Sequence, residues 1–381
     1  MNNTKPIKIF VDAHVFDKEY QGTRTFLKEI YTHLSCKENL RLFLGAFDIE
    51  NLKTNFTENS NITFIRYKKR SGFARLMFDI PSILRKHQID LAHFQYIIPP
   101  VKICRYIVTI HDTIFKEYPR EFPLFYRLSR NYLFKRATAK ADLITTVSDY
   151  SKKSIEKYLY VKKEKIELIP NGVSDLFFKP YNKQSSQNFI KNKYGIGKFI
   201  LYVSRFEPRK NHESLLKAFL DLKLYEQGYF LVLLGHHSLR NGKFDKIING
   251  LPQEIRKFIF ISSKVNDQEL LTFYQSATAF VYPSRYEGFG ISPLEAAALK
   301  IPVICSNTTG MKDFSFFGDL HIDPDNYNLL KNKLTEILIH PPNYKQLQKI
   351  ADIIRKKYSW EKPAEDFYQL LLQGFKKWKS K

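Results

Sequence analysis

A chain of 381 residues in which 44% are hydrophobic is too long and too apolar to be disordered over most of its length. At about 150 residues per domain, this length predicts two or three folded domains. The formal net charge of +23 favours an anionic partner, but charge alone does not choose between nucleic acid, an anionic membrane and a phosphorylated substrate. No run of about 18 apolar residues occurs, so the sequence predicts no membrane-spanning helix.

The first half of the chain alternates short β-rich runs with helical patterns. The runs are rich in Val, Ile and Phe and are apolar on both faces, which is typical of buried parallel strands. We expect these strands at residues 7–13, 41–47, 62–67, 91–97, 106–112, 143–148 and 166–170. Residues 22–34 carry apolar side chains on one helical face and predict the first helix.

The second half repeats this alternation. Strands are predicted at residues 199–204, 230–235, 258–262, 279–284 and 302–306. Helices are predicted at residues 211–224, 267–277, 291–300 and 325–340. Strands that alternate with helices in both halves predict two α/β domains, each with a parallel sheet. We place the first domain at 1–173 and the second at 199–359, joined by a polar, strandless linker at 174–198.

The cysteines say little about function. Cys36, Cys104 and Cys305 lie far apart, with neither metal-ligand spacing nor an even-numbered disulfide framework. The first residues lack the long apolar core of a signal peptide. We therefore expect a cytoplasmic protein with reduced thiols.

The strongest functional pattern follows the predicted strand at 279–284. In parallel α/β sheets, ligands bind beyond the carboxyl ends of the strands. The loop here contains Glu287, Gly288 and Gly290, and Glu295 lies in the helix that follows. Glycines let a backbone approach a ligand closely, a helix N-terminus attracts phosphate, and carboxylates accept hydrogen bonds from sugar hydroxyls. The spacing alone fits equally well a strand–helix turn whose acidic side chains are only solvated.

A second pattern follows the predicted strand at 199–204. Arg205, Arg209 and Lys210 place cations at the end of this strand and before a helix. Arg suits bidentate contact with phosphate, and Lys suits a point contact. Such a charge cluster is commonplace by itself, and its value comes from its place beside the acidic loop.

Two weaker patterns belong to the first half. His111 and Asp112 end the predicted strand at 106–112 and could bind a polar substrate, although a lone His after a strand is more often structural. Gly22 opens the helix at 22–34, where a glycine usually serves only the turn.

Together these segments resemble the glycosyltransferase family 4 enzymes of GT-B fold. The matching segments are Gly22-Thr-Arg24, His111-Asp112, TTVSDYSK (145–152), IPNGVS (169–174), SRFEPRKN (204–211), ELLTFYQSATAFVYPSRYEGFGISPLEAAALKIPVI (269–304) and YSWEKPAEDFY (358–368). The resemblance covers most of the chain. It implies two Rossmann-like α/β domains whose parallel sheets face a central cleft, with a C-terminal helix at about 360–381 that crosses back to the N-terminal domain.

The resemblance also implies roles for individual residues. Arg205 and Lys210 would bind the donor diphosphate and stabilise it as a leaving group, and Glu287 would contact the sugar near its reacting carbon. His111 would touch the same sugar from the N-terminal domain. The other implied donor contacts are Gly288, Phe289 and Gly290 for the sugar, Glu295 with Leu294 nearby for the ribose, Lys264 and Val265 for the base, and Gly22 for the phosphate.

The family resemblance implies a retaining transfer of a hexose from a nucleotide-diphosphate sugar, without a metal or other cofactor. The EGFGISPLEA loop favours mannose as this hexose, and the acceptor would be a glycan or lipid-linked saccharide in cell-surface polysaccharide synthesis. A same-face substitution and a double displacement through Glu287 both remain open. Three departures from the family pattern stand out: a single Gly22 in the first loop, Ser263 in place of a common glycine, and Lys312-Asp313 in place of a Pro-Glu pair.

Two other functions compete with this one. A catalytically inactive nucleotide-sugar- or glycan-binding protein would share the fold, but the intact Arg205, Lys210, Glu287 and Glu295 argue against it. A nucleic-acid-binding protein would explain the charge, but the sequence has no recognition helix, RNP-like strand or zinc spacing. We therefore expect no nucleic-acid partner.

Residues 66–87 and 120–140 are basic segments with interleaved aromatic side chains. Such segments can lie on anionic lipid, which would place a cytoplasmic enzyme peripherally on the inner face of the membrane. The alternative is that the aromatic side chains belong to the core and the cations are merely solvated.

Overall fold

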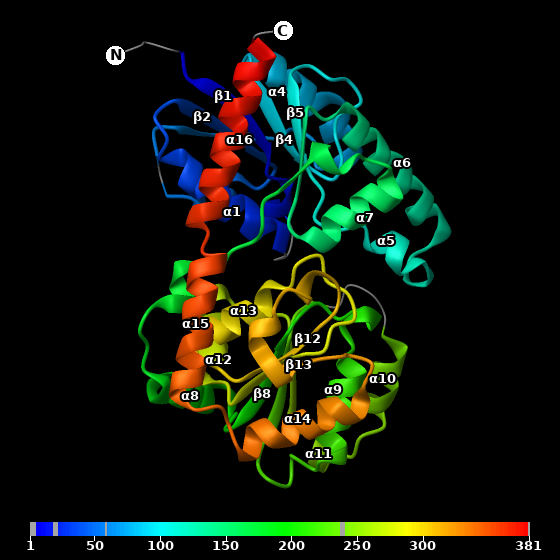
Figure 1. The fold of residues 1–381 in the computed structure, drawn as a ribbon, viewed down its shortest axis with the longest axis vertical. Helices are drawn as coiled ribbons and strands as arrows, with labels where there is room; N and C mark the ends of the chain where they lie inside the picture. Colours follow the sequence, from blue (N-terminus) through cyan, green and yellow to red (C-terminus); the bar gives the residue numbers. More distant parts are fainter. Residues whose placement is uncertain (1–4, 18–21, 58, 237–240, 380–381) are drawn as a thin grey trace. The chain divides into compact units, whose positions relative to one another are not determined.

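The computed structural model describes residues 5–17, 22–57, 59–236 and 241–379. The chain forms two compact units (Figure 1). Unit 1 comprises Met1–Gly172 together with Trp360–Lys381, and unit 2 comprises Val173–Ser359.

The described part of unit 1 contains a parallel sheet of seven strands in the order β3-β2-β1-β4-β5-β6-β7. The strands are β1 (Ile7–Asp12), β2 (Leu40–Ala46), β3 (Ile62–Arg66), β4 (Leu91–Gln95), β5 (Arg105–Thr109), β6 (Leu143–Thr146) and β7 (Ile166–Leu168). The helices are α1 (Gly22–Ser35), α2 (Ile49–Thr54), α3 (Gly72–Ala74), α4 (Ile80–Lys86), α5 (Ile114–Glu117), α6 (Leu124–Lys140), α7 (Asp149–Leu159) and α16 (Glu361–Lys379), with a π-helical turn at Arg75–Asp79 between α3 and α4. Each strand predicted in the first half is confirmed.

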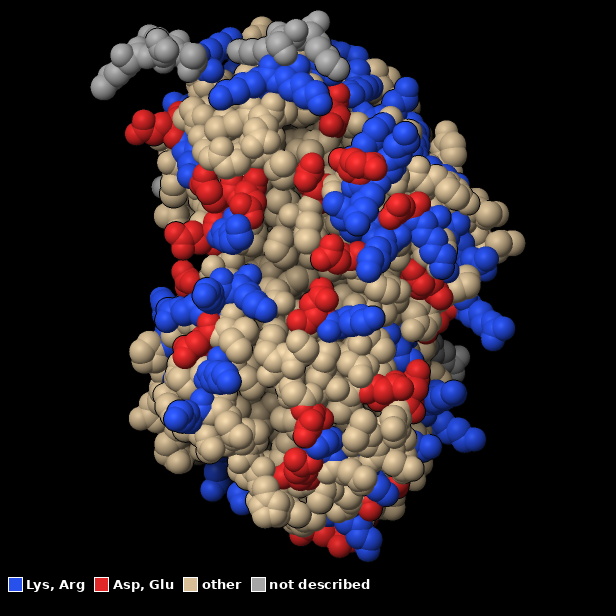
Figure 2. All heavy atoms as spheres, viewed as in Figure 1, with Lys and Arg blue, Asp and Glu red and all other residues tan. Residues whose placement is uncertain are grey.

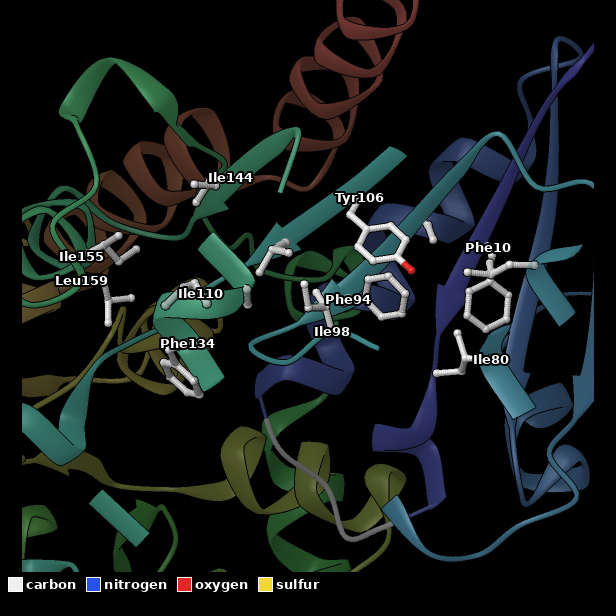
Figure 3. Packing of buried hydrophobic residues seen from close by; sticks show 14 of the residues in the cluster. Phe10, Ile80, Phe94, Ile98, Tyr106, Ile110, Phe134, Ile144, Ile155 and Leu159 are labelled. Atoms are coloured by element: carbon white, nitrogen blue, oxygen red, sulfur yellow. The ribbon is translucent and has the colours of Figure 1, made fainter. Parts of the chain in front are cut away.

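Helices cover both faces of this sheet. Neighbouring side chains of a strand point to opposite faces, so apolar residues on either side are buried. Phe94 on β4 packs beside Phe10 and Tyr106 in a buried cluster that also holds residues of α4, α6 and α7 (Figure 3). The preceding residue, His93, contacts Phe26 of α1 and Phe367 of α16 on the other face. The sheet is therefore buried on both sides, which explains why its strands are apolar on both faces.

The C-terminal helix α16 packs against α1 (Figure 1). Trp360, just before α16, lies with its ring centroid 6.1 Å from that of Phe26. Lys37, after α1, pairs with Glu365 at 2.7 Å. The prediction that the C-terminal helix returns to the N-terminal domain is confirmed.

The described part of unit 2 contains a parallel sheet of six strands in the order β10-β9-β8-β11-β12-β13. The strands are β8 (Phe199–Val203), β9 (Phe230–Leu234), β10 (Ile259–Ser262), β11 (Ala279–Tyr282), β12 (Val303–Ser306) and β13 (His321–Ile322). The helices are α8 (Lys183–Tyr194), α9 (His212–Asp221), α10 (Gly242–Asn249), α11 (Gln253–Arg256), α12 (Asp267–Ser276), α13 (Ile291–Ala298), α14 (Tyr327–Ile339) and α15 (Tyr344–Tyr358). All five predicted strands are confirmed, and β13 is an addition of two residues that sequence pattern did not reveal.

The segment predicted as a linker, 174–198, is instead part of unit 2. Its helix α8 packs against α12, where Ser186 Oγ donates a hydrogen bond of 2.9 Å to Gln275 and Tyr194 Oη one of 3.0 Å to Glu269. The sequence of α8 looks like a linker because most of its side chains are exposed, and Ile190 is its fully buried apolar residue. Among the described residues, no helix is long and apolar enough to span a bilayer.

Candidate active site

The loops that follow β8 and β11 form the candidate site of unit 2. These two strands are neighbours in the parallel sheet, so their carboxyl ends lie at the same edge. A 3-10 turn at Pro208–Lys210 follows β8 and turns two cationic side chains inward, so that both are buried. The loop after β11 carries Glu287, which is 8% exposed.

Lys210 and Glu287 form a buried ion pair, with Lys210 Nζ in hydrogen-bond contact with Glu287 Oε1. The same carboxylate oxygen accepts a hydrogen bond of 2.8 Å from Tyr282 Oη, at the last position of β11. Lys210 Nζ lies 3.3 Å from this phenol oxygen. The three groups therefore hold one another at fixed positions beneath the edge of the sheet.

Arg209 extends this pair into a charged network. Its Nη2 lies 2.6 Å from Glu207, its Nη1 lies 3.6 Å from Glu287 Oε2, and Nη1 also donates 2.6 Å to the backbone carbonyl of Tyr286. Arg205, by contrast, has a side chain that is 44% exposed and pairs with Glu207 at 3.2 Å. A buried arginine thus joins the two glutamates, and an exposed one lies at the rim.

The network fixes the ionisation of its members. Burial and the charge of Arg209 lower the pKa of Lys210 to about 8, against the opposing charge of Glu287. Burial would raise the pKa of Glu287, but the charges of Lys210 and Arg209 and the hydrogen bonds from Lys210 and Tyr282 lower it to about 2. At neutral pH the carboxylate is therefore ionised and the amine is mostly protonated.

The loop between Glu287 and α13 is a tight turn. Gly290 has φ +92°, and a Cβ there would lie 2.5 Å from the Met311 side chain. Glu287 N donates a hydrogen bond of 2.9 Å to Thr309 Oγ1, and Gly310 N donates one of 3.0 Å to Glu287 O. The close packing and positive φ make glycine necessary at position 290.

The implied donor-binding residues of this loop divide into backbone and side-chain groups. Phe289 packs edge-on against Phe314 and Tyr358, so its side chain belongs to the core and only its backbone can serve a ligand. Leu294 on α13 is fully buried. Glu295, the next residue, is 9% exposed and accepts a hydrogen bond of 3.0 Å from Tyr274 Oη of α12.

Lys264 and Val265 lie between β10 and α12, at the same edge of the sheet. Lys264 is exposed and its backbone N donates 3.1 Å to Ser262 Oγ, whereas Val265 is half-buried. The following residue, Asn266, caps α12 through a capping box with Glu269. The predicted base-reading backbone therefore belongs to a short loop that a helix cap holds in place.

His111 and Gly22 belong to unit 1. His111 is 6% exposed and its Nε2 lies 2.6 Å from Gln95 Oε1. Gln95 Nε2 lies 3.1 Å from His93 Nε2, and His93 Nδ1 lies 2.7 Å from Tyr31 Oη. Burial lowers the pKa of His111 to about 3, so this imidazole is neutral at physiological pH.

Gly22 is exposed at the start of α1, and a Cβ there would meet no atom within 4 Å. The described structure therefore gives no steric reason for a glycine at this position. Asp112 beside His111 accepts a hydrogen bond of 3.1 Å from the backbone of Ile114 and serves the local turn.

The structure thus gathers Arg205, Lys210, Glu287 and Glu295 at one sheet edge of unit 2. The sequence pattern marked Arg209 only as one of three cations suited to phosphate and pointed to neither Glu207 nor Tyr282, although all three are buried in the network. Arg209 was visible as part of the cation cluster, but Tyr282 resembles any apolar strand residue. Within the described residues, no group of three or more His, Cys, Asp or Glu side chains is placed to hold a metal ion.

The two basic segments of unit 1 expose apolar side chains. Phe73 and Phe78 are 72% and 61% exposed, and Phe125 on α6 is 84% exposed. Phe134, in contrast, is buried in the core, and Leu76 packs partly against it. The alternative that the aromatic side chains belong to the core therefore holds for Phe134 but not for the exposed Phe73, Phe78 and Phe125. Lys and Arg side chains gather over α6 and α7 on the face seen in Figure 2.

Two family models of known proteins match the two halves of this chain. The family model described as Glycosyltransferase Family 4 matches residues 43–175, and the model described as Glycosyl transferases group 1 matches residues 183–354. O-antigen chain mannosyltransferase B of Escherichia coli is 25% identical over 280 residues, which are 73% of each chain. Serotype-specific mannosyltransferase WbdA of Escherichia coli is 26% identical over 244 residues, which are 62% of this chain. The match spans only 29% of the length of WbdA.

A solved structure matches almost the whole chain. Sucrose-phosphate synthase from Thermosynechococcus elongatus superposes with a TM-score of 0.77 over 97% of this chain and 99% of that one, at 21% sequence identity. At this identity the likeness establishes the fold and leaves the substrates open.

Proposed function

Because this chain belongs to glycosyltransferase family 4, we propose that it transfers mannose from a nucleotide-diphosphate sugar to a glycan or lipid-linked saccharide. The chain is a glycosyltransferase, and its two parallel α/β units are those of the GT-B fold. The names of the two mannosyltransferase relatives support mannose as the sugar. The O-antigen name of the first supports a role in cell-surface polysaccharide synthesis.

The observation that carries the proposal is the buried ion pair of Lys210 and Glu287 at the sheet edge. A protonated Lys210, with Arg205 at the rim, would stabilise the negative charge that develops on the leaving diphosphate. The bond between the anomeric carbon and the diphosphate oxygen breaks, the acceptor hydroxyl oxygen bonds to the same carbon, and the hydroxyl proton passes to the leaving diphosphate.

We further propose that this exchange takes place on one face of the sugar and retains its anomeric configuration. A double displacement would need Glu287 as the nucleophile. Its Oε1 already binds Lys210 and Tyr282, and its lowered pKa of about 2 makes it a weak nucleophile. Glu287 is better suited to hold the sugar than to bond to the anomeric carbon.

The remaining donor contacts would follow the same edge of the sheet. Glu295 would accept hydrogen bonds from the ribose hydroxyls, and the backbone at Gly288 and Gly290 would bind the sugar. The backbone of Lys264 and Val265 would read the base. No cofactor or metal enters this scheme.

A nucleotide-sugar panel tests the donor. The purified chain would be melted with GDP-mannose, UDP-glucose, UDP-N-acetylglucosamine and ADP-glucose, since a ligand of the folded state stabilises it by about 2.7 kcal/mol at 100 Kd. We expect GDP-mannose to raise the melting temperature most and to support mannosyl transfer to a saccharide acceptor, with the α-configuration of the product read by NMR. Stabilisation by another donor alone would contradict the mannose assignment, and a β-linked product would contradict retention.

Exposed apolar side chains on α6 support binding of unit 1 to an anionic membrane. Leu124, Leu128 and Tyr132 recur every fourth residue and are 62%, 60% and 67% exposed. Arg130, on the same helix, lies over the Tyr126 ring at 5.1 Å. Apolar side chains beside cations suit the interface of a bilayer that contains anionic lipid. We propose that the enzyme lies peripherally on the cytoplasmic face of the membrane.

Flotation with vesicles of phosphatidylcholine and phosphatidylglycerol tests this surface. The wild-type chain should float with these vesicles at low salt and less at high salt, and Leu128→Glu should weaken flotation strongly. Ile339→Glu is the matched control, because Ile339 of unit 2 is exposed to a similar degree, 64% against 60%. No flotation of the wild type, or equal loss in both variants, would contradict the proposal.

A further inference from the structure

Two buried tyrosines hold the two glutamates of the Glu287–Glu295 segment. Tyr282 Oη donates a hydrogen bond of 2.8 Å to Glu287 Oε1, and Tyr274 Oη donates one of 3.0 Å to Glu295 Oε2. Tyr282 is 4% exposed and Tyr274 is fully buried. Each carboxylate is therefore held from the core side by a phenol.

The two tyrosines belong to one aromatic stack. The ring of Phe280 on β11 lies 5.5 Å from Tyr274 and 6.0 Å from Tyr282, with interplanar angles of 24° and 13°. Tyr202 of β8 packs edge-on against Tyr282 at 5.3 Å. Packing of this kind fixes the rings, and with them the direction of each phenol hydrogen bond.

We propose that Tyr282 and Tyr274 are positioning residues with separate tasks: Tyr282 orients Glu287 for sugar transfer, and Tyr274 orients Glu295 for nucleotide binding. The proposal rests on the proposed function of this site. It assigns the transfer step to the Tyr282–Glu287–Lys210 group and the donor affinity to the Tyr274–Glu295 pair.

The reason for the first task lies in the shared oxygen. Lys210 and Tyr282 both bind Glu287 Oε1 before the donor arrives. A diphosphate carries more negative charge than one carboxylate and would draw Lys210 toward itself. Tyr282 then remains as the donor to Oε1 and keeps Glu287 ionised and oriented. Burial and the neighbouring Glu287 charge raise the pKa of Tyr282 well above its usual value, so the phenol stays a donor.

The second task follows from the chemistry of Glu295. Its carboxylate lies on α13, and Tyr274 on α12 fixes one of its oxygens. A glutamate held in this way loses less side-chain entropy when it accepts hydrogen bonds from two ribose hydroxyls. Because the ribose takes no part in bond exchange, this contact would stabilise the bound donor and the transition state equally.

Steady-state kinetics of Tyr282→Phe and Tyr274→Phe separate the two tasks. Losing a hydrogen bond to a charged group should lower kcat of Tyr282→Phe by about 10- to 100-fold, with the KM for donor within twofold. Tyr274→Phe should raise the donor KM by about tenfold and leave kcat within twofold. The control is Tyr106→Phe in unit 1, which removes a buried phenol whose Oη donates 2.8 Å to Val101 O, and both of its parameters should stay unchanged. The same change in kcat and KM in both site variants, or no change, would overturn the proposal.

An acid titration of stability tests the Tyr282–Glu287 contact without any substrate. The pKa of Glu287 is lowered from 4.5 to about 2 in the folded chain, so its stabilising effect is present above pH 4.5 and is lost as the pH falls toward 2. Tyr282→Phe should raise this folded pKa and make the acid loss smaller than in wild type, whereas Tyr106→Phe should not. If no donor is used by the wild type but this difference appears, the proposed function fails and the contact stands. If Tyr282→Phe loses as much stability in acid as Tyr106→Phe does, the proposed role of Tyr282 is overturned.

Discussion

The central strands of the two sheets end in different kinds of polar network. In unit 2, β8 and β11 end at buried charges, and Lys210, Arg209, Glu207 and Glu287 neutralise one another. In unit 1, β4 and β5 end at neutral groups, where Gln95 joins His111 to His93. The central strands therefore end in charged groups at β8 and β11 of unit 2 and in uncharged groups at β4 and β5 of unit 1.

We propose that this difference decides which part of a nucleotide sugar each edge would bind. A diphosphate needs fixed cations, and the charged network supplies Lys210 already paired and already desolvated. A sugar hydroxyl needs neutral donors and acceptors, which a neutral imidazole and amide provide. Burial lowers the pKa of both His93 and His111 to about 3, so both imidazoles at the ends of β4 and β5 stay uncharged across the physiological range.

The largest expected effect comes from breaking the charged edge on one side only. Lys210→Met leaves Glu287 buried without its main partner, which should cost about 3–5 kcal/mol of unfolding free energy and abolish transfer. In Lys210→Met/Glu287→Leu both charges are gone, so stability should return to within about 1 kcal/mol of wild type while activity stays absent. Chemical denaturation and a donor-transfer assay measure the two effects. A double variant as unstable as Lys210→Met would mean that the pair is not energetically coupled.

We next predict that the buried charge of Asp12 in unit 1 serves stability and not ligand binding. The Asp12 carboxylate, 1% exposed at the end of β1, accepts 2.8 Å from Tyr67 and lies 3.4 Å from Arg75. Burial would raise the pKa of Asp12, but His14 and Arg75 hold it well below its usual value. Its stabilising effect is thus present above about pH 4 and is lost as the pH falls.

Asp12→Asn should therefore cost about 2 kcal/mol at pH 7 and less at pH 3. Urea denaturation at both values measures it. The KM for donor should change little, and a large rise would show that unit 1 uses this carboxylate for a ligand, as we propose for Glu287 in unit 2.

Much of this comparison was predictable from sequence. Buried parallel strands are continuous apolar runs, and each predicted run became a strand. The run at 106–112 extends past the end of β5 at Thr109, because the buried Ile110 and His111 prolong the apolar pattern beyond the last hydrogen-bonded residue. β13 has two residues, too few to produce a pattern.

The partners within the site were harder to predict. The cations after β8 could be identified from their charge. The sequence did not predict that the turn at Pro208–Lys210 buries Arg209 and leaves Arg205 exposed. The apolar pattern of β11 predicts that Tyr282 is a core residue, and Tyr282 is buried. Only the folded course of the loop after β11 shows that the Tyr282 phenol reaches Glu287.

A third prediction converts the neutral edge into a charged one. In Gln95→Glu, a carboxylate would replace the amide that lies 2.6 Å from His111 Nε2. An opposite charge at this distance raises the pKa of an imidazole, by one unit or more as a rough guide. Transfer should then fall about tenfold as the pH drops through the raised pKa, whereas wild type and Gln95→Leu should show no histidine limb at that pH. A wild-type profile with a limb near pH 6.5 would contradict the neutral edge.

The smallest effect is expected for Arg205, which lies at the rim of the charged edge, whereas Arg209 lies in its interior. Arg205 is 44% exposed and pairs with Glu207, which Arg209 also binds at 2.6 Å. Exposed pairs contribute little, so Arg205→Ala should change the unfolding free energy by less than about 1 kcal/mol. Its loss should still weaken donor binding by about five- to tenfold, because a diphosphate would no longer meet the outer cation.

Arg209→Ala is the matched comparison, since it leaves two buried glutamates short of a partner and should destabilise the chain by several kcal/mol. Denaturation of both variants, with calorimetric titration of GDP, measures the contrast. Equal stability losses would mean that exposure does not separate the two arginines and that the charged edge has no distinct rim.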